Sequence, residues 1–250
     1  MMRRRAYHRF SYRDSNFRLC CDTMTAVACA EIVRQREILE DYIRRQPDFR
    51  ASLIPLGLLP DAPEIAQDMA DAAVRVGVGP LAGVAGAIAE RAARAALAHG
   101  AREAIVENGG DIFAASPQPL LIALHAGPDS PLNGLAFRLE PDDMPRAVCS
   151  SSSRMGHSLS LGHSDLATVV ATNAALADAA ATRLCNMVHT EDDIDPALEY
   201  ITHVPGIDGA LVACGTRVGL LGSLPELVRH ADADATRKIT RDRDSDTPNH

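Results

Sequence analysis

The alternation of hydrophobic and polar positions divides the chain into a helical first half and a strand-rich second half. Residues 6–20 predict a strand pair with its turn at 13–16, because Tyr-, Phe- and Leu-bearing arms flank four polar residues. Apolar positions at helical spacing predict helices over 26–45, 63–76 and 80–99. Pro47 ends the first of these helices.

Short apolar runs, separated by Gly, Pro, Asn and Asp, follow from residue 104. They predict strands over 104–107, 120–125, 135–139, 146–150 and 166–171. Helices over 174–188 and 196–203 come next, and a strand pair, 210–213 with 217–221, closes the pattern. Helices, then strands, then helices indicate an α+β fold. We expect one domain over 1–230 and a charged, disordered tail over 231–250.

Composition excludes some classes of partner. A net charge of −8 gives no electrostatic footprint for nucleic acid, and 4% aromatic residues without Trp give no platform for stacking bases. The basic start, Met1 to Arg5, is not followed by the apolar run of a signal peptide. Charged residues interrupt the longest apolar segment, 80–98, so it is not expected to span a membrane. A soluble, cytoplasmic protein is expected. The six cysteines lack a Cys-x-x-Cys pair, which favours free thiols in a reducing compartment.

An alanine-rich helix over residues 174–186 is the most informative segment, because it carries Asp178 and Thr182 four residues apart. That spacing places the carboxylate and the hydroxyl on one helix face. Oxygen ligands on a surface of small residues suit a hard cation such as Mg²⁺ and the phosphates that it carries. The alternative is a tightly packed helix whose two polar side chains face solvent or bond locally.

Two glycine-rich segments are candidates for close approach of the backbone to an anionic ligand. Gly79 precedes a predicted helix N-terminus, where free N–H groups bind anions, although a plain helix–helix turn is the favoured alternative. In the segment Asn108, Gly109, Gly110 and Asp111, the glycines would lie against a ligand while the Asn and Asp present polar groups. A hairpin turn explains this second segment equally well.

A serine-rich segment between two predicted strands gathers hydroxyls, a cation and a titratable base. Arg154 with Ser151, Ser152 and Ser153 is typical of a phosphate or pyrophosphate cradle. His157 is the candidate acid/base, because imidazole titrates near neutral pH. A flexible surface linker is the alternative.

Four segments together resemble the flavin transferases of the ApbE type (FAD:protein FMN transferases), and more closely an uncharacterised ApbE-like sister family. They are residues 77–90, 106–113, 151–162 and 175–186. The resemblance to the sister family covers most of residues 5–225, whereas that to the transferases is confined to the Asn-Gly-Gly-Asp turn and the Ala-Asp-x-x-x-Thr helix. It implies an ApbE-like, T-fold-like domain in which an antiparallel-rich sheet packs with several small-residue helices.

The resemblance also implies an activity, namely Mg²⁺-assisted attack on the FAD pyrophosphate that moves FMN onto a Thr hydroxyl of another protein. Asp178 and Thr182 match the side chains that hold the metal, and the Gly109–Gly110 turn matches the part that lies against the nucleotide. His157 falls where the transferases carry a His before an Asp-Pro segment, but His-Ser-Leu-Ser stands here, and the flavin-binding stretch before it is much shorter.

Two hypotheses of function follow from these residues. The first is a Mg²⁺-dependent transferase or hydrolase of FAD, in which the cation and Arg154 neutralise developing charge. The second is a non-catalytic flavin- or nucleotide-binding accessory protein in cofactor or sulfur metabolism. The expected partners are a flavin nucleotide and a protein acceptor or redox partner, and a homodimer is the default oligomeric expectation. Neither nucleic acid nor a membrane is expected as a partner.

Overall fold

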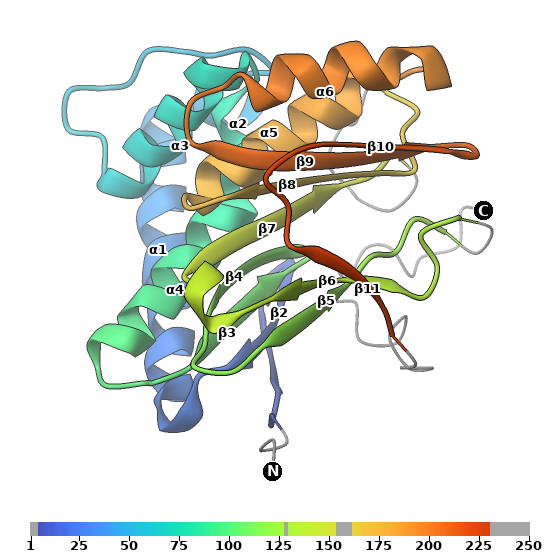
Figure 1. Ribbon diagram of the computed structural model, residues 1–250. Helices are drawn as coiled ribbons and strands as arrows, with labels where there is room; N and C mark the ends of the chain where they lie inside the picture. Colours follow the sequence, from blue (N-terminus) through green and yellow to red (C-terminus); the bar gives the residue numbers. More distant parts are fainter. Residues whose placement is uncertain (1–4, 128–129, 154–161, 231–250) are drawn as a thin grey trace, which may run out of the picture.

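A computed structural model describes residues 5–127, 130–153 and 162–230. Its central feature is an antiparallel sheet of eight described strands, with helices on one face and a three-stranded antiparallel sheet on the other (Figure 1). In spatial order the eight strands are β1 (His8–Tyr12), β2 (Ser15–Cys20), β3 (Ala104–Asn108), β4 (Asp111–Ala115), β7 (Arg146–Ser151), β8 (Leu166–Ala171), β9 (Ile207–Cys214) and β10 (Arg217–Gly222). The smaller sheet has the order β11 (Glu226–Arg229), β6 (Leu135–Leu139) and β5 (Leu120–Ala123).

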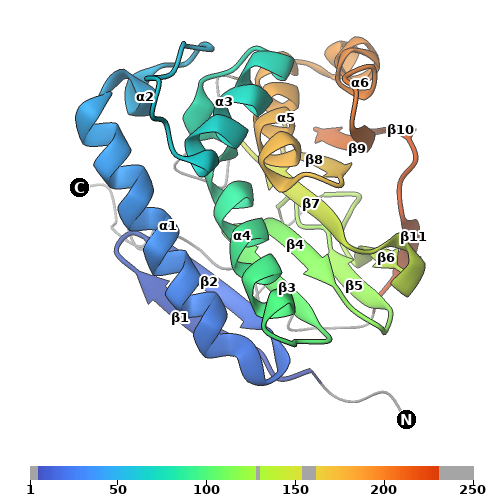
Figure 2. The same cartoon turned by 90° about the vertical axis from the view of Figure 1, so that its left-hand side faces the viewer.

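The helices form a layer over one face of the large sheet (Figure 2). They are α1 (Thr25–Arg45), α2 (Asp48–Ala51), α3 (Glu64–Val76), α4 (Val84–Ala98), α5 (Ala174–Met187) and α6 (Ile194–Thr202). Four short 3₁₀ helices are also described, η1 (Asp22–Met24), η2 (Pro80–Gly83), η3 (Pro141–Asp143) and η4 (Glu191–Asp193). Helix α4 packs on β3 and β4, α5 on β7 and β8, and α6 on β9 and β10, while α1 and α3 lie against α4 and α5 respectively.

The middle of the large sheet is buried on both faces, and β8, in which every residue is buried, shows the effect on the sequence. Ala167 and Val169 belong to the core beneath the helices, whereas Leu166 and Val170 belong to a second core beneath the three-stranded sheet. A strand covered on both sides reads as a continuous apolar run rather than as an alternation. The predicted α+β fold with an antiparallel-rich sheet is confirmed.

Three elements go beyond the sequence prediction: α2, β4 and β11. Strand β4 begins directly after Gly110, because Gly109 and Gly110 form a two-residue turn with φ of 65° and 108° that brings Asn108 opposite Asp111. Positive φ at both turn residues is the geometry of a tight hairpin. The hairpin interpretation of this segment is therefore confirmed.

A helix that crosses a membrane must be both long and apolar. Within the residues described, no single helix could cross a membrane on these two criteria; Glu64–Val76 and Pro80–Ala98 meet them only as a pair, which is bent by 108°.

The close approach of α4 to α5 depends on Gly86. A Cβ atom at this position would lie 2.2 Å from the carbonyl oxygen of Ala174 and 3.0 Å from Cβ of Asp178. Glycine usually costs about 1 kcal/mol in a helix interior relative to Ala. The structure explains why this helix tolerates that cost, since a side chain here would force the two helices apart.

We predict that Gly86→Ala lowers the free energy of unfolding by about 1–3 kcal/mol, because overpacking outweighs the gain in helix propensity. Urea denaturation measures the change. Gly57→Ala is the control, since no atom lies within 4 Å of a Cβ built there, and its effect should stay below about 1 kcal/mol. Equal stability of the two variants would show that α4 and α5 are not held this close.

Candidate functional site

Asp178 lies in the second turn of α5, with its carboxylate at the N-terminus of α4. Its Oδ2 atom accepts a hydrogen bond of 2.9 Å from the backbone N–H of Gly86, and the N–H of Ala85 bonds to the same carboxylate. Helix α4 begins at Val84, so both amides belong to the first turn, whose N–H groups have no partner within the helix. Asp178, which belongs to α5, therefore caps the N-terminus of α4.

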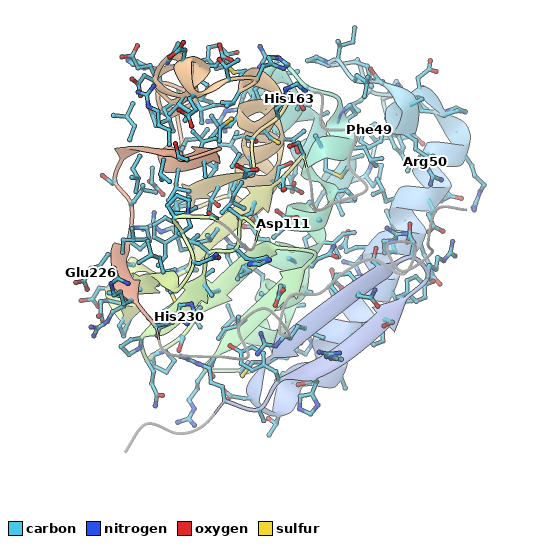
Figure 3. All side chains as sticks on the ribbon, turned by 90° about the vertical axis from the view of Figure 1, so that its right-hand side faces the viewer. Phe49, Arg50, Asp111, His163, Glu226 and His230 are labelled. Carbon is cyan, nitrogen blue, oxygen red and sulfur yellow. The ribbon has the colours of Figure 1, made fainter. Side chains whose placement is uncertain are left out.

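Asp111, the first residue of β4, approaches the same place from the sheet. Its Oδ1 atom accepts a 3.2 Å hydrogen bond from the backbone N–H of Ser150 on β7, and its carboxylate also bonds to the thiol of Cys149. Asp111 and Asp178 are both buried. Asp111 lies near the middle of the view in Figure 3.

Burial changes the pKa of both carboxylates, and the charge of Asp178 also acts on Asp111. Burial raises the pKa of Asp111 well above its ordinary value, and the neighbouring charge of Asp178 raises it further. Burial also raises the pKa of Asp178 to about 7, against the opposing effect of the Gly86 and Ala85 amides. Two buried carboxylates that interact in this way are stable only if a proton neutralises one of them or a cation binds nearby.

Cys149 completes this buried group, whereas the sequence pattern predicts only that it lies in a strand. Burial raises the pKa of its thiol, and the charges of Asp111 and Asp178 raise it further, so the sulfur stays protonated. The same sulfur lies 3.7 Å from the carbonyl oxygen of Ala174 at the start of α5. In the sequence, one feature indicates that Cys149 lies near the site: it stands two residues before Ser151, at the end of a strand.

Thr182 follows Asp178 by one turn of α5 and is partly exposed. Four-residue spacing in a helix places the two side chains on one face. The alanines around them, from Ala174 to Ala181, are almost completely buried. The alanines of this helix are tightly packed, as one of the two interpretations expects. The role of Asp178 and Thr182 as metal ligands stays a prediction.

The serines at the end of β7 divide into two kinds. The hydroxyls of Ser152 and Ser153 donate hydrogen bonds of 2.7 Å each to the carbonyl oxygens of Asp165 and Ser164, so both help to join β7 to the segment before β8. Ser151 is buried, and its hydroxyl has no hydrogen-bond partner among the residues that the structure describes. It projects to the same side of the sheet as Cys149, two residues earlier, the side covered by α5.

Of the remaining predicted residues, Gly79 packs against another segment, Asn108 pairs with Asp111, and two fall outside the described chain. Gly79 packs against another loop, because a Cβ there would lie 1.8 Å from the carbonyl oxygen of Ser52. Asn108 is buried at the end of β3, opposite Asp111. Arg154 and His157 fall within 154–161, outside the described residues.

A separate cavity of about 160 Å³ lies between α3, α4 and the start of α5. It is lined by Asp68, Ala87, Glu90, Arg91, Arg94, Asn173 and Ala175. Its charges are already paired, since Glu90 accepts from the N–H of Ala174 at 2.7 Å and from Arg94 at 2.7 Å. None of the predicted site residues lines it, and we assign no chemistry to it.

Comparison with known proteins identifies the family. The family described as AbpE bacteria matches residues 4–205, and the chain belongs to it. A UPF0280 protein of Methanocella arvoryzae is 36% identical over 93% of this chain and 94% of the relative. Another UPF0280 protein, from Methanocaldococcus jannaschii, is 39% identical over 88% of this chain and 92% of the relative. The resemblance of the four sequence segments to an ApbE-like family is thereby confirmed.

Solved structures with a similar course of the chain include two flavin transferases. The flavinyl transferase ApbE of Pseudomonas stutzeri is 13% identical, with a TM-score of 0.49 over 94% of this chain and 96% of that one. The flavin transferase ApbE of Vibrio cholerae is 12% identical, with a TM-score of 0.48 over 89% of this chain and 97% of that one.

The raised pKa of Asp178 predicts how stability depends on pH in the metal-free protein. Because its folded-state pKa, about 7, exceeds the ordinary 3.8, the folded chain keeps a proton that the unfolded chain loses between these pH values. The contribution of Asp178 to stability should therefore be fully present below about pH 4 and be lost, by up to a few kcal/mol, as pH rises towards 7. Asp178→Asn should flatten this fall, as measured by thermal unfolding in EDTA.

The control for that experiment is Asp71→Asn on the exposed surface of α3, which changes the same chemistry without burial. It should retain the wild-type pH dependence. An equal fall for wild type and Asp178→Asn would contradict the assignment of the proton to this carboxylate.

Proposed function

We propose that this protein is a Mg²⁺-dependent enzyme that cleaves the pyrophosphate of FAD and transfers or releases FMN. The observation that carries the proposal is the buried pair Asp111 and Asp178 beside the Gly109–Gly110 turn. A protein that needed these residues only for packing would gain stability by replacing one acid with an amide. Functional sites are where such unfavourable groups are retained.

The donors available near the pair suit Mg²⁺. Asp178 and Thr182 are the proposed ligands, and Asp111 supplies a second carboxylate nearby, so all the donors are the hard oxygens that Mg²⁺ prefers. When bound, Mg²⁺ would neutralise charge on the pyrophosphate oxygens. A divalent cation would also remove the repulsion that raises the pKa of Asp111.

The surroundings of the pair suit a nucleotide phosphate. No described atom lies within 4 Å of a Cβ built at Gly109, so one side of the hairpin turn is open to an approaching ligand. The hydroxyl of Ser151, buried without a described partner, is a donor that a phosphate oxygen would satisfy. We assign Ser152 and Ser153 to the walls of the same site, with Asn108 and Asp111 beside the turn.

The proposed reaction breaks the P–O bond between the FMN and AMP halves of FAD. An acceptor hydroxyl, from water or from a threonine of another protein, attacks the phosphorus of the FMN half, and AMP leaves with the bridging oxygen. We assign His157 to accept the proton of the acceptor, and Arg154 to hold the negative phosphate. Gly79, the residue before η2, stays a proposed contributor to anion binding.

Release of AMP from FAD with Mg²⁺, measured by liquid chromatography with water and with a threonine peptide as acceptors, tests this function. Asp178→Asn keeps an acceptor for the Gly86 amide but loses the charge, and it should lower the rate about 100-fold or more. Thr182→Val should also lower the rate.

The matched control is Thr202→Val, because among the described residues this hydroxyl in α6 bonds within its own helix, to the carbonyl oxygens of Leu198 at 2.8 Å and Glu199 at 3.4 Å. It should keep the wild-type rate. A wild-type protein that binds FAD but releases no AMP with either acceptor would favour the non-catalytic accessory protein. Failure to bind FAD at all would contradict both.

A further inference from the structure

Two histidines from different segments meet at the C-terminal end of α5, away from the carboxylate pair. The rings of His163 and His189 are perpendicular, and their centroids are 5.6 Å apart. Both side chains are exposed. In Figure 3, His163 lies well above Asp111 on the same side of the molecule.

The backbone holds both histidines in place. The N–H of His163 donates a 2.8 Å hydrogen bond to the carbonyl oxygen of Val188, which precedes His189. The N–H of His189 donates a 3.0 Å hydrogen bond to the carboxylate of Asp193. Gly162 lets the segment before β8 lie directly against the end of α5, since a Cβ there would lie 1.9 Å from the carbonyl oxygen of Cys185. The two rings therefore project from a rigid junction rather than from two independent loops.

The ring separation matches that of two imidazoles on one tetrahedral metal ion. A Zn–N bond of about 2.0 Å plus roughly 1.1 Å from nitrogen to ring centre places each ring centroid about 3.1 Å from the metal, so a tetrahedral angle separates the two centroids by about 5.1 Å. The observed 5.6 Å is about half an ångström longer, a difference that rotation of two exposed side chains accommodates. Exposure also leaves room for waters to complete the coordination.

We propose that His163 and His189 form a binding site for a borderline transition-metal ion of the Zn²⁺ class, distinct from the proposed Mg²⁺ site. Imidazole nitrogens suit Zn²⁺, whereas Mg²⁺ prefers oxygen. Asp193 adds negative charge beside His189 and so favours the cation. The bound ion links the segment that leads into β8 to the end of α5, and it thereby stabilises that junction.

Competition with a chromophoric chelator for Zn²⁺ tests the site in the untagged full chain, with excess Mg²⁺ present. One Zn²⁺ per chain is expected, and His163→Ala and His189→Ala should each weaken binding roughly 10-fold or more. His203→Ala, a control on the exposed end of α6, should not change it. Zn²⁺ should also raise the thermal midpoint of wild type but not of the two site variants.

The proposal is overturned if no stoichiometric Zn²⁺ binds, or if binding persists unchanged in both His163→Ala and His189→Ala. Persistence would assign the ion to other ligands, such as the cysteines. Because neither histidine belongs to the proposed flavin site, circular dichroism and AMP release should be unchanged in both variants, so this result is independent of the proposed function.

Discussion

The hydrogen bond from the Gly86 amide to the Asp178 carboxylate is the contact on which the site depends. It joins residues 92 positions apart, and it forms only because Gly86 lets α4 lie directly against α5. The first turn of α4 supplies free N–H groups, and α5 supplies the charge that satisfies them. This contact fixes both helices where the start of β4 and the end of β7 present Asp111, Cys149 and Ser151.

The same contact creates an electrostatic problem that the rest of the site must resolve. Holding Asp178 in the interior places it beside Asp111, and two buried carboxylates repel each other. The amides stabilise one negative charge, and the protonated thiol of Cys149 helps to satisfy Asp111. A proton or a cation is left to balance the second charge. We infer that this imbalance is retained for cation binding, because buried acids without such a role reduce stability.

Much of the fold was predictable, because helical and strand periodicities are local. The helix at 174–188 and the strand pair at 6–20 follow from spacing alone. The sequence leaves strand β4 open, because the segment from Asn108 to Asp111 fits a hairpin turn and a ligand-binding loop equally well. For the site, the sequence placed Asp178 and Thr182 on one helix face, but the partners of Asp178 come from another helix and from the sheet. No periodicity reports such tertiary contacts, so the roles of Gly86 and Cys149 emerged only from the structure.

The most direct test of this account is a crystal structure grown with Mn²⁺, which takes the place of Mg²⁺ and is located by its anomalous scattering. The account predicts a peak with oxygen ligands about 2.1–2.2 Å away, among them the Asp178 carboxylate and the Thr182 hydroxyl. The account would be contradicted by a map with no peak at this place at saturating Mn²⁺. It would also be contradicted if Mn²⁺ bound elsewhere and neither Asp111 nor Asp178 were among its ligands.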